Sequence, residues 1–206
     1  MGIWIPLLSG PRSGLISVAG RRRTPHDADM TANPPSAPPA VVPLARYTKE
    51  ELTEIVGDIE DPFGVAHTGL TWLAKEQHFG IRRDGRLVAH TGLVTLPLTA
   101  GTTETEVVGF GGVAVAPDLR GQGLARLVVT AAREHARTMG PPYGLLFCRP
   151  QLLPLYERLG WQALPGTVVV EQLEGPVVMP LRTMWTPLRD GQRWPEGPVR
   201  LRSLPM

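Results

Sequence analysis

The sequence predicts one α/β (α+β) domain, in which a mixed, mostly antiparallel central sheet is flanked by helices. An apolar, β-rich run over 107–115 leads through a glycine-rich turn into an amphipathic helix that begins at Leu124. Upstream, Asp84-Gly85 joins two further β-like runs, which is a strong signal for a hairpin. A chain of 206 residues is long enough for one well-buried domain and too short for two of ordinary size.

Composition and charge limit the functions that need to be considered. Hydrophobic residues make up 42% of the chain and charged residues 19%, as in a globular protein. No apolar run approaches the ~20 residues of a membrane span, so no membrane partner is expected. The net charge of +2 suits an anionic cofactor, but no basic stripe with interleaved aromatics predicts nucleic-acid binding. The single cysteine, Cys148, excludes an internal disulfide and indicates a reducing cytoplasm, and no metal site is expected.

Residues 1–43 are predicted to be a disordered leader and linker. Pro6 and Pro11 interrupt the first apolar part, and the basic cluster 21–23 follows it, whereas a signal peptide carries its charge first. The Pro- and Ala-rich run 31–43 is typical of an extended linker. A targeting role for this segment stays open.

The domain is expected to occupy 44–206, with a core over 44–175 and a C-terminal extension over 176–206. Whether translation begins at Met1 or at Met30 is left open, because a disordered leader without a targeting role is compatible with either start.

Helical and β patterns alternate through the first half of the domain. Thr48 followed by Glu51 forms a capping box ahead of apolar residues at helical spacing, and Asp61-Pro62 ends that helix. The expected elements are a helix over 49–59, a second helix over 67–76, strands over 78–83 and 86–97, and a strand over 102–115 that pairs back against the previous one.

The second half begins after Gly140-Pro141-Pro142, which ends the helix from Leu124. Gly160 is expected to close a short helix in the C′ position. The expected elements are a buried strand over 143–148 parallel to 113–116, a helix over 151–159, a strand pair over 161–164 and 167–172, and short strands or coil at 177–179, 183–188 and 194–204.

The turn that follows 107–115 is suited to an anion. A strand that leads through glycines into a helix places free backbone N–H groups and the positive end of a helix dipole together. The turn has neither the Gly-x4-Gly-Lys-Ser/Thr of a P-loop nor the third glycine of a dinucleotide fingerprint. Its pattern is Arg/Gln-x-x-Gly-x-Gly/Ala, preceded by Val-x-Val-x-Pro, and reads Arg120-Gly121-Gln122-Gly123-Leu124-Ala125. This pattern resembles the acetyl-CoA pyrophosphate loop of the GNAT superfamily of N-acetyltransferases.

The resemblance covers about residues 44–175 and implies a fold in which two neighbouring parallel strands splay apart to admit CoA. It implies acetyl-CoA as cosubstrate, with the pyrophosphate on main-chain N–H groups of the turn and the thioester along the preceding strand. The cofactor-binding residues it implies are Val113, Ala114, Val115, Arg120, Gly121, Gln122, Gly123, Leu124 and Ala125.

A second feature of the family lies downstream in Leu155-Tyr156-Glu157-Arg158-Leu159-Gly160-Trp161. In the family, a tyrosine in this context points its hydroxyl at the sulfur, so the resemblance implies Tyr156 as general acid. An unperturbed tyrosine is protonated at neutral pH, and a thiolate of pKa ~8.5 can take its proton in the transition state. The alternative is an aromatic packing residue.

The sequence does not single out a general base. Many relatives carry a glutamate on the strand before the loop, where this chain has Gly111 and Gly112. The candidates for the base and the acceptor site are Asp61, His90 and Glu106, with water relayed by backbone carbonyls as a further route. His90 lies on an alternating strand, so a buried and satisfied histidine is the competing interpretation.

Two further positions depart from or qualify the family pattern. The usual asparagine seven residues before the tyrosine is Arg149 here, which puts that contact in doubt. Cys148 as an acyl-enzyme nucleophile is the weaker interpretation of this residue, since a small buried strand residue explains it better.

The acceptor class follows only from two likenesses within the superfamily. Ala89-His90-Thr91-Gly92-Leu93 resembles aminoglycoside 2′-N-acetyltransferases, and the same motif with Trp194-Pro195-x-Gly197 resembles nodulation-factor N-acyltransferases. Both groups acylate amino sugars, which indicates a small-molecule amine as partner. Gly111 replaces the acidic residue of the first group, and the second does not keep Tyr156, so an acetyl donor is preferred. A longer-chain N-acyltransferase, a non-catalytic acyl-CoA-binding module and a homodimer are left open.

Overall fold

The computed structural model describes residues 39–206. The expected leader over 1–43 therefore lies almost wholly outside the described residues, but its last residues do not. Strand β1 (Val41–Leu44) pairs antiparallel with β2 (Gln77–Arg83). The sheet thus begins at Val41, and the boundary expected between 43 and 44 falls inside a strand.

Removing residues 1–38 should leave the melting temperature unchanged, because their composition supplies too little apolar surface to offset the entropy of ordering them. Thermal unfolding of the shortened and full-length proteins measures this. Removal of 1–44 is the matched comparison, since it also deletes β1 and should lower the melting temperature. A fall of several degrees in the shorter deletion would contradict the expectation.

The first part of the domain forms largely as its local signals indicate, but the helix expected over 49–59 ends at Val56, because Gly57 takes a positive φ of 75°. Thr48 caps α1 (Lys49–Val56) with both bonds of the capping box in place. Strands β2 and β3 (Arg86–Ala100) are joined at Asp84 and Gly85, whose φ angles of 51° and 82° suit a tight hairpin turn. Strand β4 (Thr103–Val115) pairs back against β3, as predicted.

The predicted helix over 67–76 does not form. The chain there contains only the short 3-10 helix η1 (Ala66–Thr68), and the residues up to β2 have no regular structure. Long-range backbone bonds hold this stretch instead: Leu73 N donates to Pro205 O, and Glu76 N donates to Leu93 O. These partners come from distant parts of the chain, so the local apolar spacing gave the wrong prediction.

The crossover unit follows β4 through the 3-10 helix η2 (Pro117–Leu119) and helix α2 (Leu124–Ala136) to β5 (Tyr143–Cys148). Strand β5 runs parallel to β4 as predicted, but its partners are Val107–Phe110 rather than 113–116. After it come the 3-10 helix η3 (Pro150–Leu152), α3 (Leu153–Glu157) and Gly160, which has the expected positive φ of 82°.

The C-terminal part contributes strands to the sheet, although 176–206 was expected to be an extension. β9 (Arg182–Pro187) lies between β5 and β6 (Gln162–Ala163), and β10 (Val199–Leu201) lies between β3 and β7 (Val168–Val170). The predicted pairing of 161–164 with 167–172 is wrong, because β6 pairs with β9 and β7 pairs with β10 and β8 (Val177–Val178).

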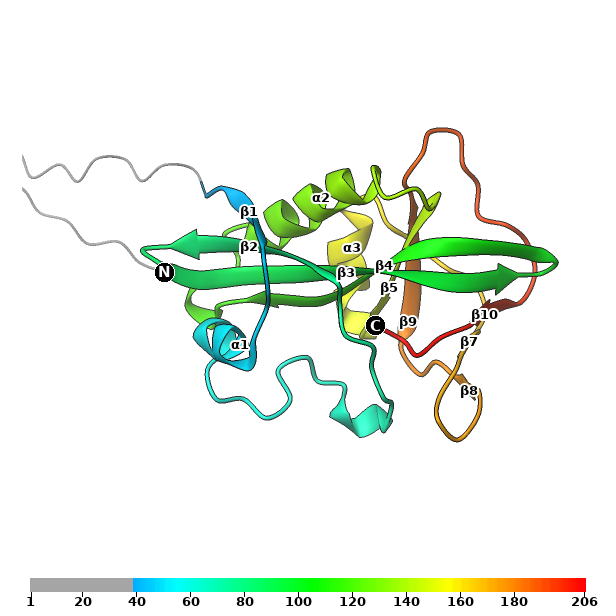
Figure 1. The fold of residues 1–206 in the computed structure, drawn as a ribbon, viewed down its shortest axis with the longest axis horizontal. Helices are drawn as coiled ribbons and strands as arrows, with labels where there is room; N and C mark the ends of the chain where they lie inside the picture. The colour runs from blue at the N-terminus through cyan, green and yellow to red at the C-terminus, as the bar shows by residue number, and fades with distance from the viewer. Residues whose placement is uncertain (1–38) are drawn as a thin grey trace, which may run out of the picture. The chain divides into compact units, whose positions relative to one another are not determined.

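The described residues form one ten-stranded sheet in the order β6-β9-β5-β4-β3-β10-β7-β8, with β2 on β3 and β1 on β2. In the view of Figure 1, α2 lies above the long β3–β4 ribbon, and α1 with the η1 segment lies below it. The expected mixed, mostly antiparallel sheet with flanking helices is therefore confirmed. Within residues 39–206, no helix is both long and apolar enough to cross a membrane.

Candidate active site

The site begins where two neighbouring parallel strands separate. The pairing of β4 with β5 ends at Phe110 and Leu146, and β4 continues to Val115 without β5 beside it. The register of β4 against β3 shifts between His90 and Gly92, and Gly112 in this bulge has a positive φ of 63°. The bulge lies immediately beyond the last β4–β5 pair, so it bends β4 at the point where the gap opens. Main-chain groups of Val113, Ala114 and Val115 border that gap.

The glycine turn after this strand has the form of an anion cradle. Gly121 and Gly123 have φ angles of 81° and 78°, which are accessible to glycine and strained for other residues. A Cβ atom at Gly121 would meet nothing within 4 Å, and one at Gly123 would meet only Arg126 Nε at 4.0 Å. The space in front of the turn is therefore open, and one arginine lies beside it.

Backbone N–H donors are also free at this turn, at the N-terminus of α2. Gly123 is the N-cap of α2, no side chain caps the helix, and the first helical bond is from Leu127 N to Gly123 O. The N–H groups of Leu124, Ala125 and Arg126 thus have no intrahelical acceptor. Free donors, a helix N-terminus and an open face fit a pyrophosphate.

Two contacts tie this cradle to the β2–β3 hairpin. Arg83 Nη1 donates to Gln122 Oε1 at 2.9 Å, and the guanidinium of Arg86 pairs with Asp118 at 3.3 Å. Arg120 Nε donates a long bond of 3.4 Å to Val115 O, at the end of β4. The side chains of Arg120 and Gln122 thus bond within the protein and order the turn. These two residues are therefore expected to bind an anion through their main-chain N–H groups.

Tyr156 lies near the end of α3, in the buried cluster that also contains Phe110. Its side chain is 5% exposed, and its ring packs edge-on against Trp161, which in turn packs edge-on against Phe110. Burial is the main cause that raises the pKa of Tyr156, and the neighbouring Cys148 adds to it. No hydrogen bond contributes to that shift. The hydroxyl is therefore protonated at neutral pH, and the Tyr156 ring belongs to the same buried cluster as Phe110, the last residue of β4 that pairs with β5.

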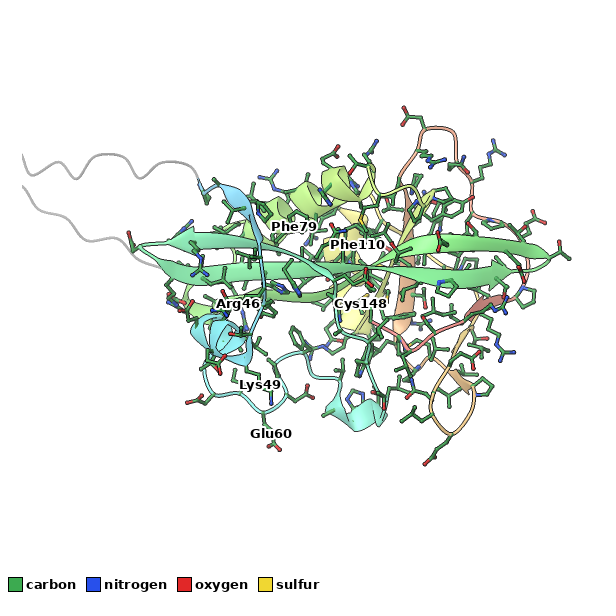
Figure 2. All side chains as sticks on the ribbon, in the orientation of Figure 1. Arg46, Lys49, Glu60, Phe79, Phe110 and Cys148 are labelled. Carbon is green, nitrogen blue, oxygen red and sulfur yellow. The ribbon has the colours of Figure 1, made fainter. Side chains whose placement is uncertain are left out.

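Cys148 belongs to the same buried cluster at the end of β5. Phe110 and Cys148 lie close to the centre of the sheet in Figure 2. Burial raises the pKa of the Cys148 thiol to about 11, so the thiolate needed for a nucleophile is scarce at neutral pH. This favours the interpretation of Cys148 as a packing residue.

His90 is buried, and both of its ring nitrogens have partners. Nδ1 donates to the carbonyl oxygen of Gly112 at 2.8 Å, and Nε2 lies 3.1 Å from Nδ1 of His78. Its ring stacks on Tyr47 with a centroid distance of 3.5 Å. Burial lowers the pKa of His90 to about 4, which makes it a weak base. The bond to Gly112 instead lets His90 hold the bulge of β4 in place.

The two carboxylates proposed from the sequence lie elsewhere. Asp61 accepts backbone bonds from Ala66 and Val65, which lower its pKa, and so it organises its own loop. Glu106 is exposed and pairs in register with Pro97, before the segment over which β4 and β5 run together. Of the three candidates from the sequence, the structure brings only His90 to the start of the gap.

Two cationic side chains that were not predicted as site residues lie near the gap. Lys75 extends along β3 and β4, with its Cε atom 2.6 Å from where a Cβ of Gly111 would lie. Arg149, at the end of β5, packs against Gly64, and its buried Nε has no hydrogen-bond partner within residues 39–206. The sequence signal for Lys75 was a glycine within each of two strands, which often marks close approach by another group.

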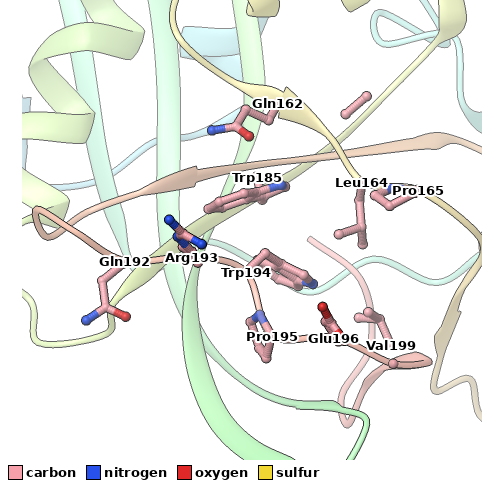
Figure 3. A pocket seen from close by; sticks show the side chains of 12 residues that line it. Gln162, Leu164, Pro165, Trp185, Gln192, Arg193, Trp194, Pro195, Glu196 and Val199 are labelled. Atoms are coloured by element: carbon pink, nitrogen blue, oxygen red, sulfur yellow. The ribbon is translucent and has the colours of Figure 1, made fainter.

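A cavity of about 510 Å³ lies apart from these residues (Figure 3). Trp185, Trp194 and Leu164 line it together with the loop 192–197. Neither the residues of the glycine turn nor Tyr156 line this cavity. Within the described residues no group of His, Cys, Asp and Glu side chains could hold a metal ion.

Comparison with known proteins agrees with this geometry. The family model described as acetyltransferase (GNAT) domain matches residues 46–164, which is more than half of the 206 residues. No curated protein matches the chain.

Three solved structures illustrate the structural likeness. The GNAT family N-acetyltransferase YhbS from Escherichia coli, in complex with CoA, is 15% identical with a TM-score of 0.54, covering 80% of this chain and 89% of that one. A putative N-acetyltransferase from Lactobacillus plantarum is 17% identical with a TM-score of 0.47, covering 73% of this chain and 99% of that one. A GNAT family acetyltransferase from Brucella melitensis, in complex with acetyl-CoA, is 16% identical with a TM-score of 0.46, covering 78% and 94%.

The matched segment contains the separated strands, the glycine turn and Tyr156, and the first of these structures shares the fold. The chain therefore belongs to the GNAT acetyltransferase family, and it is an acetyltransferase with acetyl-CoA as cosubstrate.

Proposed function

We propose that the protein transfers the acetyl group of acetyl-CoA to a primary amine of a small molecule, by direct attack of the amine on the thioester. The observation that carries the proposal is the continuity of three features: the open N–H cradle at 121–126, the unpaired edge of β4, and the buried Tyr156 beside the same gap. The cradle suits the pyrophosphate, the strand edge suits the pantetheine and the thioester carbonyl, and Tyr156 suits the sulfur.

Tyr156 is proposed as the general acid. As the N–C bond forms and the C–S bond breaks, the departing sulfur takes the hydroxyl proton of Tyr156. Burial raises the pKa of the Tyr156 hydroxyl, which keeps its proton available at neutral pH, and it also raises the pKa of the Cys148 thiol in the same cluster, to about 11. A thiolate produced in such surroundings is a strong base and recovers a proton readily.

The acceptor is proposed to be an amino sugar or a similarly small amine. The Ala-His-x-Gly-Leu motif around His90, shared with two amino-sugar acylating groups, supports this class. The Nε atom of Arg149, which is buried and has no hydrogen-bond partner within residues 39–206, supports an acceptor that also carries an anionic group. Polycationic aminoglycosides would meet like charge at Arg149, so a phosphorylated amino sugar fits the site better than they do.

The test is a thiol-release assay with acetyl-CoA and a panel of amines. The panel includes glucosamine, glucosamine 6-phosphate, aminoglycosides, polyamines, amino acids and peptides, with a long-chain acyl-CoA as alternative donor. The proposal expects release with an amino sugar and more release with its phosphate, with the N-acetyl product identified by mass spectrometry. The proposal would be overturned if thiol release occurred only with the long-chain donor, or if none of the small amines gave release.

Gly123→Val should weaken acetyl-CoA binding by ~1–3 kcal/mol, because a branched side chain would occupy the open face of the cradle and strain a positive φ. Calorimetry on the folded variant measures the affinity. Gly191→Val is the matched control: its φ of 75° is nearly the same, its Cβ meets nothing within 4 Å, and it lies outside the cradle. It should lose similar stability but keep the affinity, and an equal affinity of both variants would contradict the assignment of the cradle.

A further inference from the structure

Two glycines opposite each other in the sheet form a groove that holds the side chain of Lys75. Gly92 on β3 and Gly111 on β4 are register partners. A Cβ at Gly92 would lie 2.6 Å from Lys75 Cγ and 2.7 Å from its Cβ, and one at Gly111 would lie 2.6 Å from Cε and 3.0 Å from Nζ. The stem of the lysine therefore crosses β3, and its amine lies over β4. Any larger residue at either position would displace it.

The backbone on either side of Lys75 is held in place. Leu73 N donates to Pro205 O at 2.6 Å, and Glu76 N donates to Leu93 O at 2.9 Å. Because the chain is fixed two residues before and one residue after Lys75, the direction of the side chain along the groove is determined by the fold.

The groove delivers the amine to the opening of the gap. Gly111 follows Phe110, the last residue of β4 that pairs with β5. Successive residues of a strand point to opposite faces, so Phe110 and Gly111 face opposite sides. Phe110 packs on Trp161 and through it on Tyr156, whereas Gly111 contacts Lys75. A thioester in the gap would have Tyr156 on one side and Lys75 on the other.

The surroundings of the amine combine burial with few polar contacts. Nζ makes one long contact of 3.4 Å to Leu73 O, and burial lowers the pKa of Lys75 to about 8. The titratable groups that face it are His78 on β2 and His90 on β3, whose own pKa values are lowered in part by its charge. A charged group also lies close by: Met206 is the last residue of the sequence, and the main-chain carbon that bears its carboxylate lies 3.2 Å from the same Gly111 position. A sizeable neutral fraction therefore exists at pH 7–8, and it grows as the pH rises.

We propose that Lys75 is the general base of this enzyme and takes the proton that the acceptor amine must lose. The inference rests on the proposed function. The acceptor nitrogen forms a bond to the carbonyl carbon while one of its protons passes to neutral Nζ of Lys75. The C–S bond breaks, and the sulfur takes the hydroxyl proton of Tyr156. The ammonium of Lys75 then returns its proton through solvent to the phenolate of Tyr156, so that no proton is gained or lost overall.

The effects of Lys75 can be separated from those of other lysines, because the sequence contains so few. The sequence holds 21 lysines and arginines, and only Lys49 and Lys75 are lysines. Lys49 is exposed on α1 and is labelled in Figure 2, so it provides a matched control for every measurement on Lys75.

The kinetic test compares Lys75→Met, Lys75→Arg and Lys49→Met with the wild type, using an acceptor confirmed by product mass. Methionine keeps the unbranched stem in the groove, and arginine keeps the charge but cannot act as a base. Both Lys75 variants should bind acetyl-CoA as before, while turnover falls by roughly 10²–10⁴-fold. The rise of kcat with pH around about 8, measured at saturating acceptor, should disappear in both, and Lys49→Met should behave as wild type. Near-normal turnover of either Lys75 variant, or the same rise with pH, would overturn the inference.

Gly111→Ala tests the groove itself. The added methyl would lie 2.6 Å from Cε, at the flexible end of the side chain, so the amine must move while the fold is retained. We expect a lower turnover than wild type with unchanged affinity for acetyl-CoA. Unchanged turnover with a melting temperature like that of wild type would contradict the placement of the amine.

A spectroscopic titration gives a readout that does not depend on activity. In protein labelled with [ε-¹³C]lysine, only two side-chain signals are present, and the Lys49→Met variant assigns them. The Lys75 signal should titrate near pH 8, well below that of Lys49. An ordinary midpoint for Lys75 would overturn the inference. So would an acetyl group found on Lys75 after incubation with acetyl-CoA, since the residue would then be an acceptor.

The two proposals fail in different ways. If the wild type binds acetyl-CoA but acetylates no small amine, the proposed function fails, whatever the Lys75 signal shows. If the wild type is active and Lys75→Met is equally active, the function stands and Lys75 is not its base.

Discussion

Tyr156→Phe is expected to lower turnover by ~10²–10⁴-fold while acetyl-CoA binds as before. Phenylalanine keeps the ring that packs on Trp161 and removes the only proton that the side chain can donate. The side chain is 5% exposed, so water cannot easily take over as proton donor. Steady-state kinetics with a confirmed acceptor and calorimetry with acetyl-CoA measure the two quantities separately.

Tyr143→Phe is the matched control. Tyr143 is also buried, and its hydroxyl donates to Arg193 O at 2.7 Å. Arg193 is one of the residues that line the cavity in Figure 3, which lies apart from the gap. Its loss should cost about 1 kcal/mol of stability and leave turnover unchanged. If Tyr156→Phe kept a near-normal kcat in a well-folded protein, the role of general acid would be excluded.

Acidification from pH 6.5 to about 4 is expected to remove roughly 3 kcal/mol of the free energy of unfolding through His90. Burial lowers the pKa of His90 to about 4 in the folded protein, from 6.5 in the unfolded chain. Between these values, the unfolded chain binds a proton that the folded protein does not. Stability therefore rises with pH across this window and is lost as the pH falls.

Urea denaturation of the wild type and His90→Gln at several pH values between 4 and 7 measures this. The variant should be less stable at neutral pH, because the Gly112 carbonyl and the stack on Tyr47 lose their partner. The stability of the variant should depend less on pH. The pH dependence that comes from His78, whose pKa is also lowered, should remain. His67→Gln, at an exposed residue, should keep the wild-type dependence. Equal slopes for the wild type and His90→Gln would contradict the expectation.

Local signals predicted the parts of the fold that depend on a few neighbouring residues. The capping box at Thr48 requires only Glu51 three residues later, and the hairpin at Asp84-Gly85 requires only residues that tolerate positive φ. The glycine turn at 121–123 is of the same kind, since a helix N-terminus exposes its N–H groups wherever the helix lies. For these elements, the information and the contacts that use it lie within one turn of chain.

Pairing beyond the hairpins could not be predicted in the same way. The pairing of β5 with β4 ends at Phe110, before the bulge at Gly112, and the bond from His90 that holds this bulge joins residues 22 positions apart. The insertion of β9 between β5 and β6 involves short strands whose β patterns look alike. Many pairings satisfy such patterns equally well, so the choice is made by packing across the whole sheet.

The sequence by itself determined the α/β class, the glycine turn with its free N–H groups, and the family to which these belong. Tyr156 was also a candidate on sequence, because its motif is contiguous. Only the tertiary structure brought Lys75 to the gap, since its groove needs Gly92 and Gly111 side by side from two strands. The same contacts shield part of the side chain from water, and this burial lowers the pKa of the amine, which is a property of the packed chain and of no single segment.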